Sequence, residues 1–188
     1  MLRAFVLVLA AVLLAPFVRA ADDNPLLRAK VGDWAKYSVT VPEQGEIMEQ
    51  THKVIRKTEK GITLETSLKP GNLPAKDRES LPQEVTQGQT TVVTIPFNQA
   101  SDVSALGKGN VQVKELARGQ ETLVIAGEKI STQWVESQAT YTEQEKPVTA
   151  TLKVWTSQDV PLGLVKQEIS SPQGKTVIAL KSFGSGGA

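Results

Sequence analysis

The chain has 188 residues, with 21 Lys and Arg against 20 Asp and Glu, one His and no Cys. This balance of charge gives no electrostatic reason to expect nucleic acid or an acidic membrane as a partner. The absence of Cys excludes disulfides, thiol nucleophiles, thiolate metal sites and a lipid-modified N-terminal Cys. The length is typical of a single domain.

The first twenty residues have the features of a secretory signal peptide. Arg3 gives a positive start, residues 4–17 are almost wholly apolar, and residues 18–20 (VRA) end on the small residues of a cleavage site. The apolar run is shorter than the about twenty residues that span a membrane, which counts against an uncleaved anchor. We expect cleavage between Ala20 and Ala21, no transmembrane segment afterwards, and a periplasmic or secreted bacterial protein.

The rest of the chain is predicted to form one β-rich domain over residues 21–183, followed by a disordered Gly/Ser tail at residues 184–188. Asn24 and Pro25 suit the cap and the first position of a short helix over residues 24–30. Apolar and polar residues then alternate from Val31 to Val41, which is the pattern of a half-buried strand.

Further runs of this kind predict strands over much of the chain. They cover residues 46–57, 61–68, 90–96, 111–117, 121–126, 129–141 and 175–183, with two more strands around a Pro-Gly corner in residues 149–170. A turn is expected at Arg118-Gly119, and two long links at residues 69–88 and 98–110 interrupt the pattern. Links of this length are either solvated connectors or functional segments.

The strand count and patterning favour a mainly β fold. We expect a single, strongly curved antiparallel sheet, a half-barrel, of eight to ten strands with one short N-terminal helix. Many strands carry only two or three inward apolar residues, which fits one curved sheet better than two packed sheets.

No set of residues in the sequence predicts catalysis. His52 is alone, without a recognisable nucleophile motif, and is interpreted as a solvated strand histidine. One His and no Cys make a zinc site very poorly supplied with ligands. Carboxylates would serve a hydrolase only if two of them converged in a cleft, which a sequence does not reveal. We therefore expect no catalytic residue, no metal and no cofactor.

Three tryptophans are the candidate ligand-binding residues: Trp34, Trp134 and Trp155. Each lies in or beside a predicted strand with polar neighbours, and alternation places Trp155 with Thr151 and Lys153 on the polar side. Aromatic rings on a polar face form either a ligand groove or a cover for the edge of a core, and both interpretations stay open.

Three segments carry a resemblance to a known family: residues 24–37 (NPLLRAKVGDWAKY), residues 119–129 with the following Trp134-Val135, and residues 154–166 (VWTSQDVPLGLVK). They resemble uncharacterised exported bacterial β-rich proteins of the DUF3108-like type, most clearly over residues 119–183. The resemblance implies the curved half-barrel of the lipoprotein-carrier class, which cradles acyl chains. The shared motifs are structural rather than catalytic.

The corner at residues 159–163 has its own physical rationale. Pro161 fixes the backbone for a turn and Gly163 supplies a permissive one, while Val160 and Leu162 are expected to fold back over the sheet edge. The leading hypothesis is an exported non-catalytic protein that binds a lipid or hydrophobic small molecule on its curved sheet. The alternative is an envelope structural or protein-interaction module that binds another envelope protein. A carboxylate-dependent hydrolase ranks last.

Overall fold

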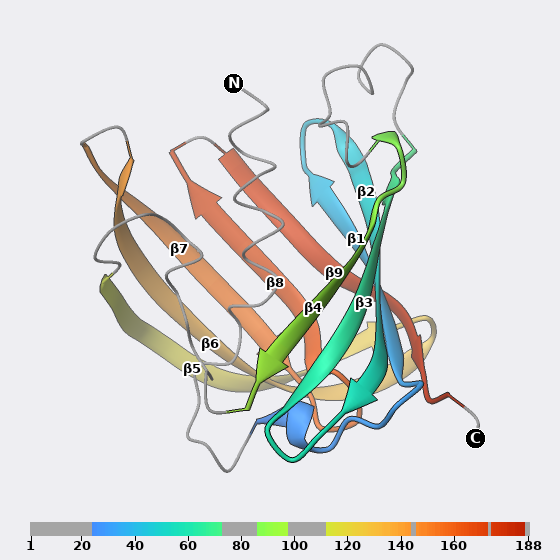
Figure 1. Cartoon of the computed structure of the whole chain (residues 1–188). Coiled ribbons are helices and arrows are strands. Elements are labelled where there is room, and N and C mark those ends of the chain that lie inside the picture. The colour runs from blue at the N-terminus through green and yellow to red at the C-terminus, as the bar shows by residue number, and fades with distance from the viewer. Residues whose placement is uncertain (1–23, 73–85, 98–111, 144–145, 173, 187–188) are drawn as a thin grey trace.

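The computed structural model describes residues 24–72, 86–97, 112–143, 146–172 and 174–186. Nine strands in this part of the chain form one antiparallel sheet (Figure 1). The strands are β1 (Trp34–Val41), β2 (Gly45–Lys57), β3 (Gly61–Pro70), β4 (Thr90–Pro96), β5 (Gln112–Ile125), β6 (Glu128–Glu143), β7 (Lys146–Thr156), β8 (Leu164–Ser171) and β9 (Gly174–Gly184). The expectation of a single antiparallel sheet with eight to ten strands is confirmed.

The order of the strands in the sheet is β4-β3-β2-β1-β9-β8-β7-β6-β5. The chain thus moves outward from β1 to one edge at β4, starts again at the other edge with β5, and returns inward to β9. The first and last strands meet at the centre, where Tyr37 lies opposite Leu180 and Val39 opposite Ile178. Within the described residues, this central pair is the only strand pairing that joins the two halves.

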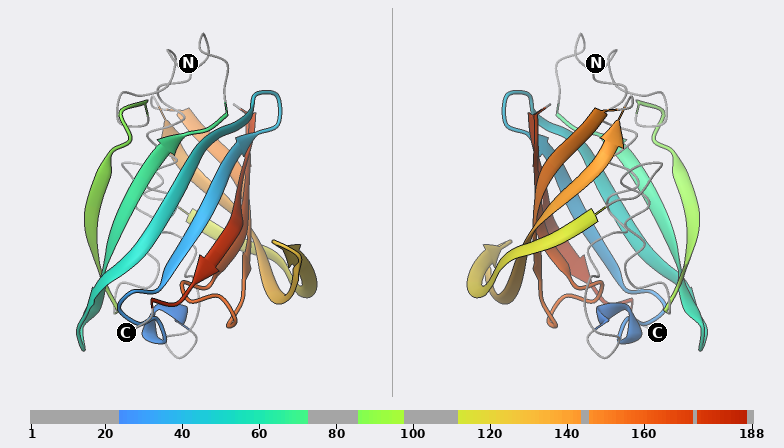
Figure 2. Two further views of the ribbon diagram at one scale, coloured as in Figure 1. Left: turned by 90° about the vertical axis from the view of Figure 1, so that its right-hand side faces the viewer. Right: turned by 90° about the vertical axis from the view of Figure 1, so that its left-hand side faces the viewer.

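The sheet is open among the described residues, with β4 and β5 as its edges. The strands of the half formed by β1–β4 and those of the half formed by β5–β8 are inclined differently (Figure 2). Strand β5 also contacts β9, although β6, β7 and β8 separate them in the strand order. The long β5–β6 hairpin therefore reaches across its neighbours.

The predicted N-terminal helix is wrong in type and length. Only Pro25–Leu27 is helical, as a single turn of 3-10 helix, labelled η2. Its start follows the expected chemistry, since the Asn24 side chain accepts a hydrogen bond from the Leu26 amide and Pro25 occupies the first turn. The turn ends early because the Lys30 amide donates to the Asp33 carboxylate at 2.7 Å, whereas in a helix it would bond to the Leu26 carbonyl.

The predicted turn at Arg118-Gly119 is also wrong. Both residues lie inside β5, opposite Val135 and Trp134 of β6, so two expected strands are one. The irregularity in this strand lies earlier, where the register shifts around Leu116. Gly119 suggested a turn, but its lack of a side chain serves the close approach of the Trp134 ring instead.

The two faces of the sheet differ strongly in character. Alternate residues of β1, namely Ala35, Tyr37 and Val39, are buried, and their neighbours in between are only partly covered. We call the face that carries these three residues the inner face and the opposite one the outer face. The core cluster draws apolar side chains from both halves of the sheet, so burial of the inner face adds to the β1–β9 ladder in holding them together.

The last strand extends one residue into the predicted tail. Strand β9 includes Gly184, the first residue of the predicted tail, and Gly186 lies against Gly32. The signal segment with Ala20 and Ala21 and the last two residues lie outside the described part of the chain.

Candidate functional site

One row of side chains crosses the inner face from β6 to β3. The strand registers place the following residues side by side: Val135, Val154, Gln167, Ile178, Val39, Met48 and Pro70. Gln167 of β8 is the one polar member of this row. It has no exposed surface, and neither its amide nitrogen nor its amide oxygen has a hydrogen-bond partner. An amide left unpaired in an apolar setting costs about 1–3 kcal/mol.

Two more inner-face residues carry unpaired polar atoms. Thr176 of β9 lies diagonally across from Gln167, since it pairs with Ile169, and its hydroxyl is fully buried without a partner. Gln50 of β2 is 2% exposed, and its amide oxygen is unpaired. Native proteins satisfy nearly all buried polar atoms, so three such residues on one face make it the candidate site of this molecule.

His52 and Tyr37 form a separate polar group on the same face. The Nδ1 atom of His52 lies 2.8 Å from the Thr66 hydroxyl, and its ring meets the Tyr37 ring edge-on at 5.7 Å. The Tyr37 hydroxyl donates to the Leu164 carbonyl at 3.2 Å. Burial lowers the pKa of His52 to about 4 and raises the pKa of Tyr37 well above its usual value. His52 is 6% exposed, so the predicted solvated histidine is wrong.

Charge is absent from the centre of the inner face. The inward residues of β1, β8 and β9 are all neutral. Two charged groups at the margins are already engaged. Arg118 of edge strand β5 pairs with Glu115 through two hydrogen bonds, of 2.6 and 2.8 Å, and Lys57 donates to the carbonyls of Leu27 and Ala29. An apolar surface with neutral donors and acceptors suits an uncharged apolar ligand bearing an ester, amide or hydroxyl group.

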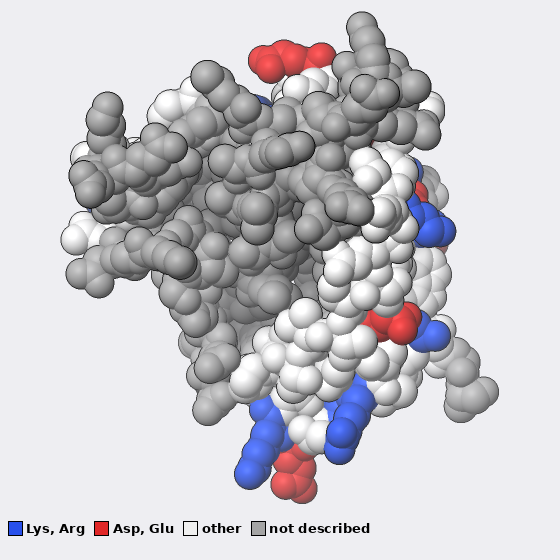
Figure 3. Space-filling model, turned by 45° about the horizontal axis from the view of Figure 1, so that its top comes forward, with Lys and Arg blue, Asp and Glu red and all other residues white. Residues whose placement is uncertain are grey.

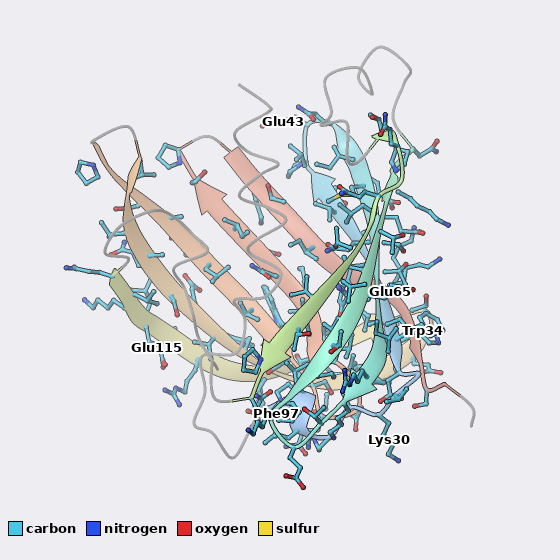
Figure 4. All side chains as sticks on the ribbon, viewed as in Figure 1. Lys30, Trp34, Glu43, Glu65, Phe97 and Glu115 are labelled. Atoms are coloured by element: carbon cyan, nitrogen blue, oxygen red, sulfur yellow. The ribbon has the colours of Figure 1, made fainter. Side chains whose placement is uncertain are left out.

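The structure places the three tryptophans on the outer face. Trp34 lies in a row with Gly184, Lys53, Glu65 and Val92, and in Figure 4 Trp34 and Glu65 lie on the same side of this half of the sheet. A Cβ atom on Gly184 would come within 2.9 Å of the Trp34 indole nitrogen. The ring thus covers a strand glycine, which is how aromatic residues stabilise glycines across a ladder.

Trp134 and Trp155 lie side by side across β6 and β7, apart from Trp34. The Lys153 ammonium is 3.9 Å from the centre of the Trp134 ring and 4.8 Å from that of Trp155, while Lys166 is also 4.8 Å from Trp155. The Trp155 indole N–H donates to the Glu121 carboxylate of β5. These contacts use both rings to hold β5, β6, β7 and β8 together.

Trp155 belongs to the core despite its place on the polar side. Its pairing with Lys166 confirms the predicted alternation, yet it is only 4% exposed. Val160 and Leu162 of the corner are buried as expected, and the corner closes through hydrogen bonds of 2.8 Å from Ser157 N to Gly163 O and from Gly163 N to Val160 O. The contacts described for the three tryptophans are structural, and ligand binding by their rings stays a prediction.

The described residues also bear on metal binding, on membrane spans and on the two long links. Within the described ranges, no cluster of three or more His, Asp or Glu side chains could hold a metal ion. In the described part of the chain, no helix is long and apolar enough to cross a bilayer. Most of the link at residues 69–88 and the whole of the link at 98–110 lie outside the described residues.

Gln50, Gln167 and Thr176 lie in no recognisable catalytic motif, so they were not among the residues predicted to be functional. A signal was nevertheless present. In β8 the alternation Val165, Gln167, Ile169 places Gln167 where an apolar residue is expected. A polar residue at an inward position is informative because burying it without a partner is costly.

The comparisons with known proteins find similarity among solved structures, at low sequence identity. No protein-family model matches the chain. No curated protein matches it either. Three solved structures overlap most of it: a candidate exported protein of Bacteroides fragilis with a YmcC-like fold, a candidate lipoprotein of Parabacteroides distasonis and a hypothetical protein of Chlamydia trachomatis.

Their sequence identities to this chain are 10%, 12% and 13%, with TM-scores of 0.47, 0.47 and 0.46. The alignments cover 84%, 83% and 87% of this chain and 97%, 96% and 92% of the respective structures. At these values the likeness assigns neither a family nor a function.

Proposed function

We propose that this is an exported, non-catalytic protein that binds a neutral hydrophobic ligand, of the acyl-ester or acyl-amide class, on its inner face. In this proposal the sheet is a half-barrel, and the inner face is its hollow side. The observation that carries it is Gln167: a fully buried amide in an otherwise apolar row, with both polar atoms unpaired.

The chemistry of the ligand follows from what the face offers. The Gln167 amide supplies a donor and an acceptor, and the Thr176 hydroxyl supplies either. With no inward-facing cation on β1, β8 or β9, a carboxylate or phosphate on the inner face would be buried without a counter-charge, which is strongly unfavourable. An ester or amide of a long acyl chain would satisfy the polar atoms and cover the apolar ones.

Export is part of the proposal and rests on the sequence alone. Residues 1–20 have the charge, apolar stretch and small-residue ending of a signal peptide. Cleavage after Ala20 would place the protein in the periplasm or outside the cell. N-terminal sequencing of the mature protein tests this directly, and a retained Met1 would contradict it.

Binding is tested with a fluorescent monoacylglycerol and the matching fluorescent fatty acid at neutral pH. We expect the acylglycerol to bind more tightly than the fatty-acid anion. Gln167→Leu and Thr176→Val should each weaken acylglycerol binding by about 5–10-fold, the value of one net hydrogen bond. Thr40→Val, a change of the same kind on the outer face of β1, is the control and should leave the affinity unchanged.

The same variants separate a binding role from a structural one. Because the Gln167 amide is unpaired, Gln167→Leu should raise the stability of the ligand-free protein while it lowers the affinity. Native mass spectrometry of protein purified from the envelope should show a retained neutral lipid. Failure of both probes to bind, with no retained lipid, would rule the proposal out.

A further inference from the structure

The two edges of the sheet are not equally protected against pairing. Edge strand β5 carries Lys114, Glu115 and Arg118, and its register shifts beside Leu116, all of which hinder the addition of another strand. Edge strand β4 (TTVVTIP) has no charge and no register shift. It lies within an uncharged run from residue 85 to residue 101. In Figure 3 the surface over β4 is correspondingly white.

The backbone groups that β4 leaves free can be assigned from the ladder. Gln89 accepts from Leu68 of β3 at 2.9 Å, and Phe97 donates to Lys60 at 2.9 Å. The register between these points is unbroken, so the odd-numbered residues of β4 bond to β3. The even-numbered residues Thr90, Val92 and Thr94 therefore direct their N–H and C=O groups away from the sheet. Within the described chain nothing pairs with them.

The same three residues also present their side chains on the outer face, where Val92 is 60% exposed. Their sequence is symmetric about Val92, with Thr on either side. In an antiparallel pair of two such strands, Val92 would face Val92 and each Thr90 would face a Thr94. Every free donor of the three residues would then meet an acceptor, and β-branched and Thr–Thr pairs are favourable across strands. Pro96, which has no N–H, would end the ladder.

We propose that β4 pairs with β4 of a second copy of this chain, in antiparallel register about a two-fold axis at Val92. This pairing joins two nine-stranded sheets into one. A two-fold interface must be complementary to itself, and the uncharged Thr-Val-Thr pattern meets that condition, which a charged edge would not. The proposal is independent of ligand binding on the inner face.

The first test measures the mass of the purified protein by sedimentation over a range of concentrations. The wild type should shift from monomer to a mass twice as large as the concentration rises. Val92→Lys places two like charges opposite each other and should be monomeric throughout. Val124→Lys makes the same change at a residue of β5 that is 65% exposed, and should dimerise as the wild type does. A wild type that stays monomeric at all concentrations overturns the proposal.

A second test reports the register. Because the chain has no Cys, Val92→Cys introduces a single thiol. Residues facing each other in a hydrogen-bonded antiparallel pair have Cα atoms about 5.5 Å apart, within the range of disulfides. Mild oxidation should cross-link Val92→Cys into a dimer many times faster than Val124→Cys. Equal rates would contradict the register, and a different protein captured by β4 would contradict the choice of a second copy.

Discussion

His52 shows how burial on the inner face affects a single residue. Its ring contacts the Thr66 hydroxyl and the edge of Tyr37, and burial is what lowers its pKa. The neutral ring fits this site, whereas a charged ring would be buried without a counter-ion. The residue that looked most like a catalytic base in the sequence is therefore held in its neutral, packed form.

A pH dependence of stability follows from this burial. The pKa of His52 is about 4 in the folded protein against 6.5 for the free side chain, so the unfolded chain binds an extra proton between these values. Stability should be fully present above pH 6.5 and fall by about 3 kcal/mol as the pH drops to about 4. Urea unfolding at a series of pH values measures this loss.

The matched variant for this prediction is His52→Gln, which retains polarity but does not titrate. Burial alone would raise the pKa of Glu49 and of Glu168, but hydrogen bonds from neighbouring lysines lower both pKa values. Protonation of these two carboxylates therefore also lowers the stability of the protein at acid pH. Their contribution is common to wild type and variant. If the two proteins show the same pH dependence between 6.5 and 4, the assignment to His52 is wrong.

At the scale of elements, two tryptophans are paired with glycines across adjacent strands. Trp34 of β1 covers Gly184 of β9, and Trp134 of β6 covers Gly119 of β5. In both pairs the indole ring occupies the space that a side chain on the glycine would need. The first pair packs β1 against β9, and the second packs β5 against β6 within the edge hairpin.

This arrangement predicts an unusual response to Gly119→Ala. Alanine normally stabilises a strand relative to glycine, but its Cβ would lie 2.7 Å from the Trp134 ring. We expect a loss of about 1–3 kcal/mol by the cost of overpacking, measured by urea unfolding. In Trp134→Leu the same Gly119→Ala change should cost much less, because the ring is gone.

Val124→Ala on the same strand is the control, since Val124 is exposed, and it should change the free energy of unfolding by no more than about 0.5 kcal/mol. An equal effect of Gly119→Ala with and without the Trp134 ring would show that the two residues are not coupled.

Sequence patterning predicted these elements unevenly. Alternation in β1 is visible because its inward positions are all apolar, and Pro161 with Gly163 marks the corner through local backbone chemistry. Gly119 has the same local signature as a turn, and only the ring on the adjacent strand decides otherwise. For the candidate site, the three tryptophans were visible as residue types, but Gln167 became informative only when the registers placed it among apolar neighbours on both sides.

At the scale of the molecule, the fold depends on a pairing between the ends of the chain. Trp34 lies opposite Gly184, while every other strand pair in the described chain joins neighbours in sequence. The nine strands alternate in direction, so the edges β4 and β5 run the same way and cannot join as an antiparallel pair. The β1–β9 pair is thus the one costly loop closure in an otherwise local sheet.

This topology predicts the behaviour of a circular permutant. A flexible linker joins residue 186 to residue 24, and the chain is opened between β4 and β5, so that every strand pairs with its neighbour in sequence. Described residues near the joined ends are already close, since Gly32 lies against Gly186. The permutant should keep the far-ultraviolet circular dichroism spectrum of the wild type and, because each of its strand ladders joins neighbours in sequence, refold about tenfold faster or more in stopped-flow experiments.

A second permutant is the control. It has the same linker but opens at the turn between Lys57 and Gly61, so the β2–β3 pair becomes the distant one and the rate gain should be lost. If the first permutant folds no faster than this control, closure of the β1–β9 pair does not limit folding. If it fails to form the sheet at all, the segment between β4 and β5 has a structural role beyond connecting the two edges.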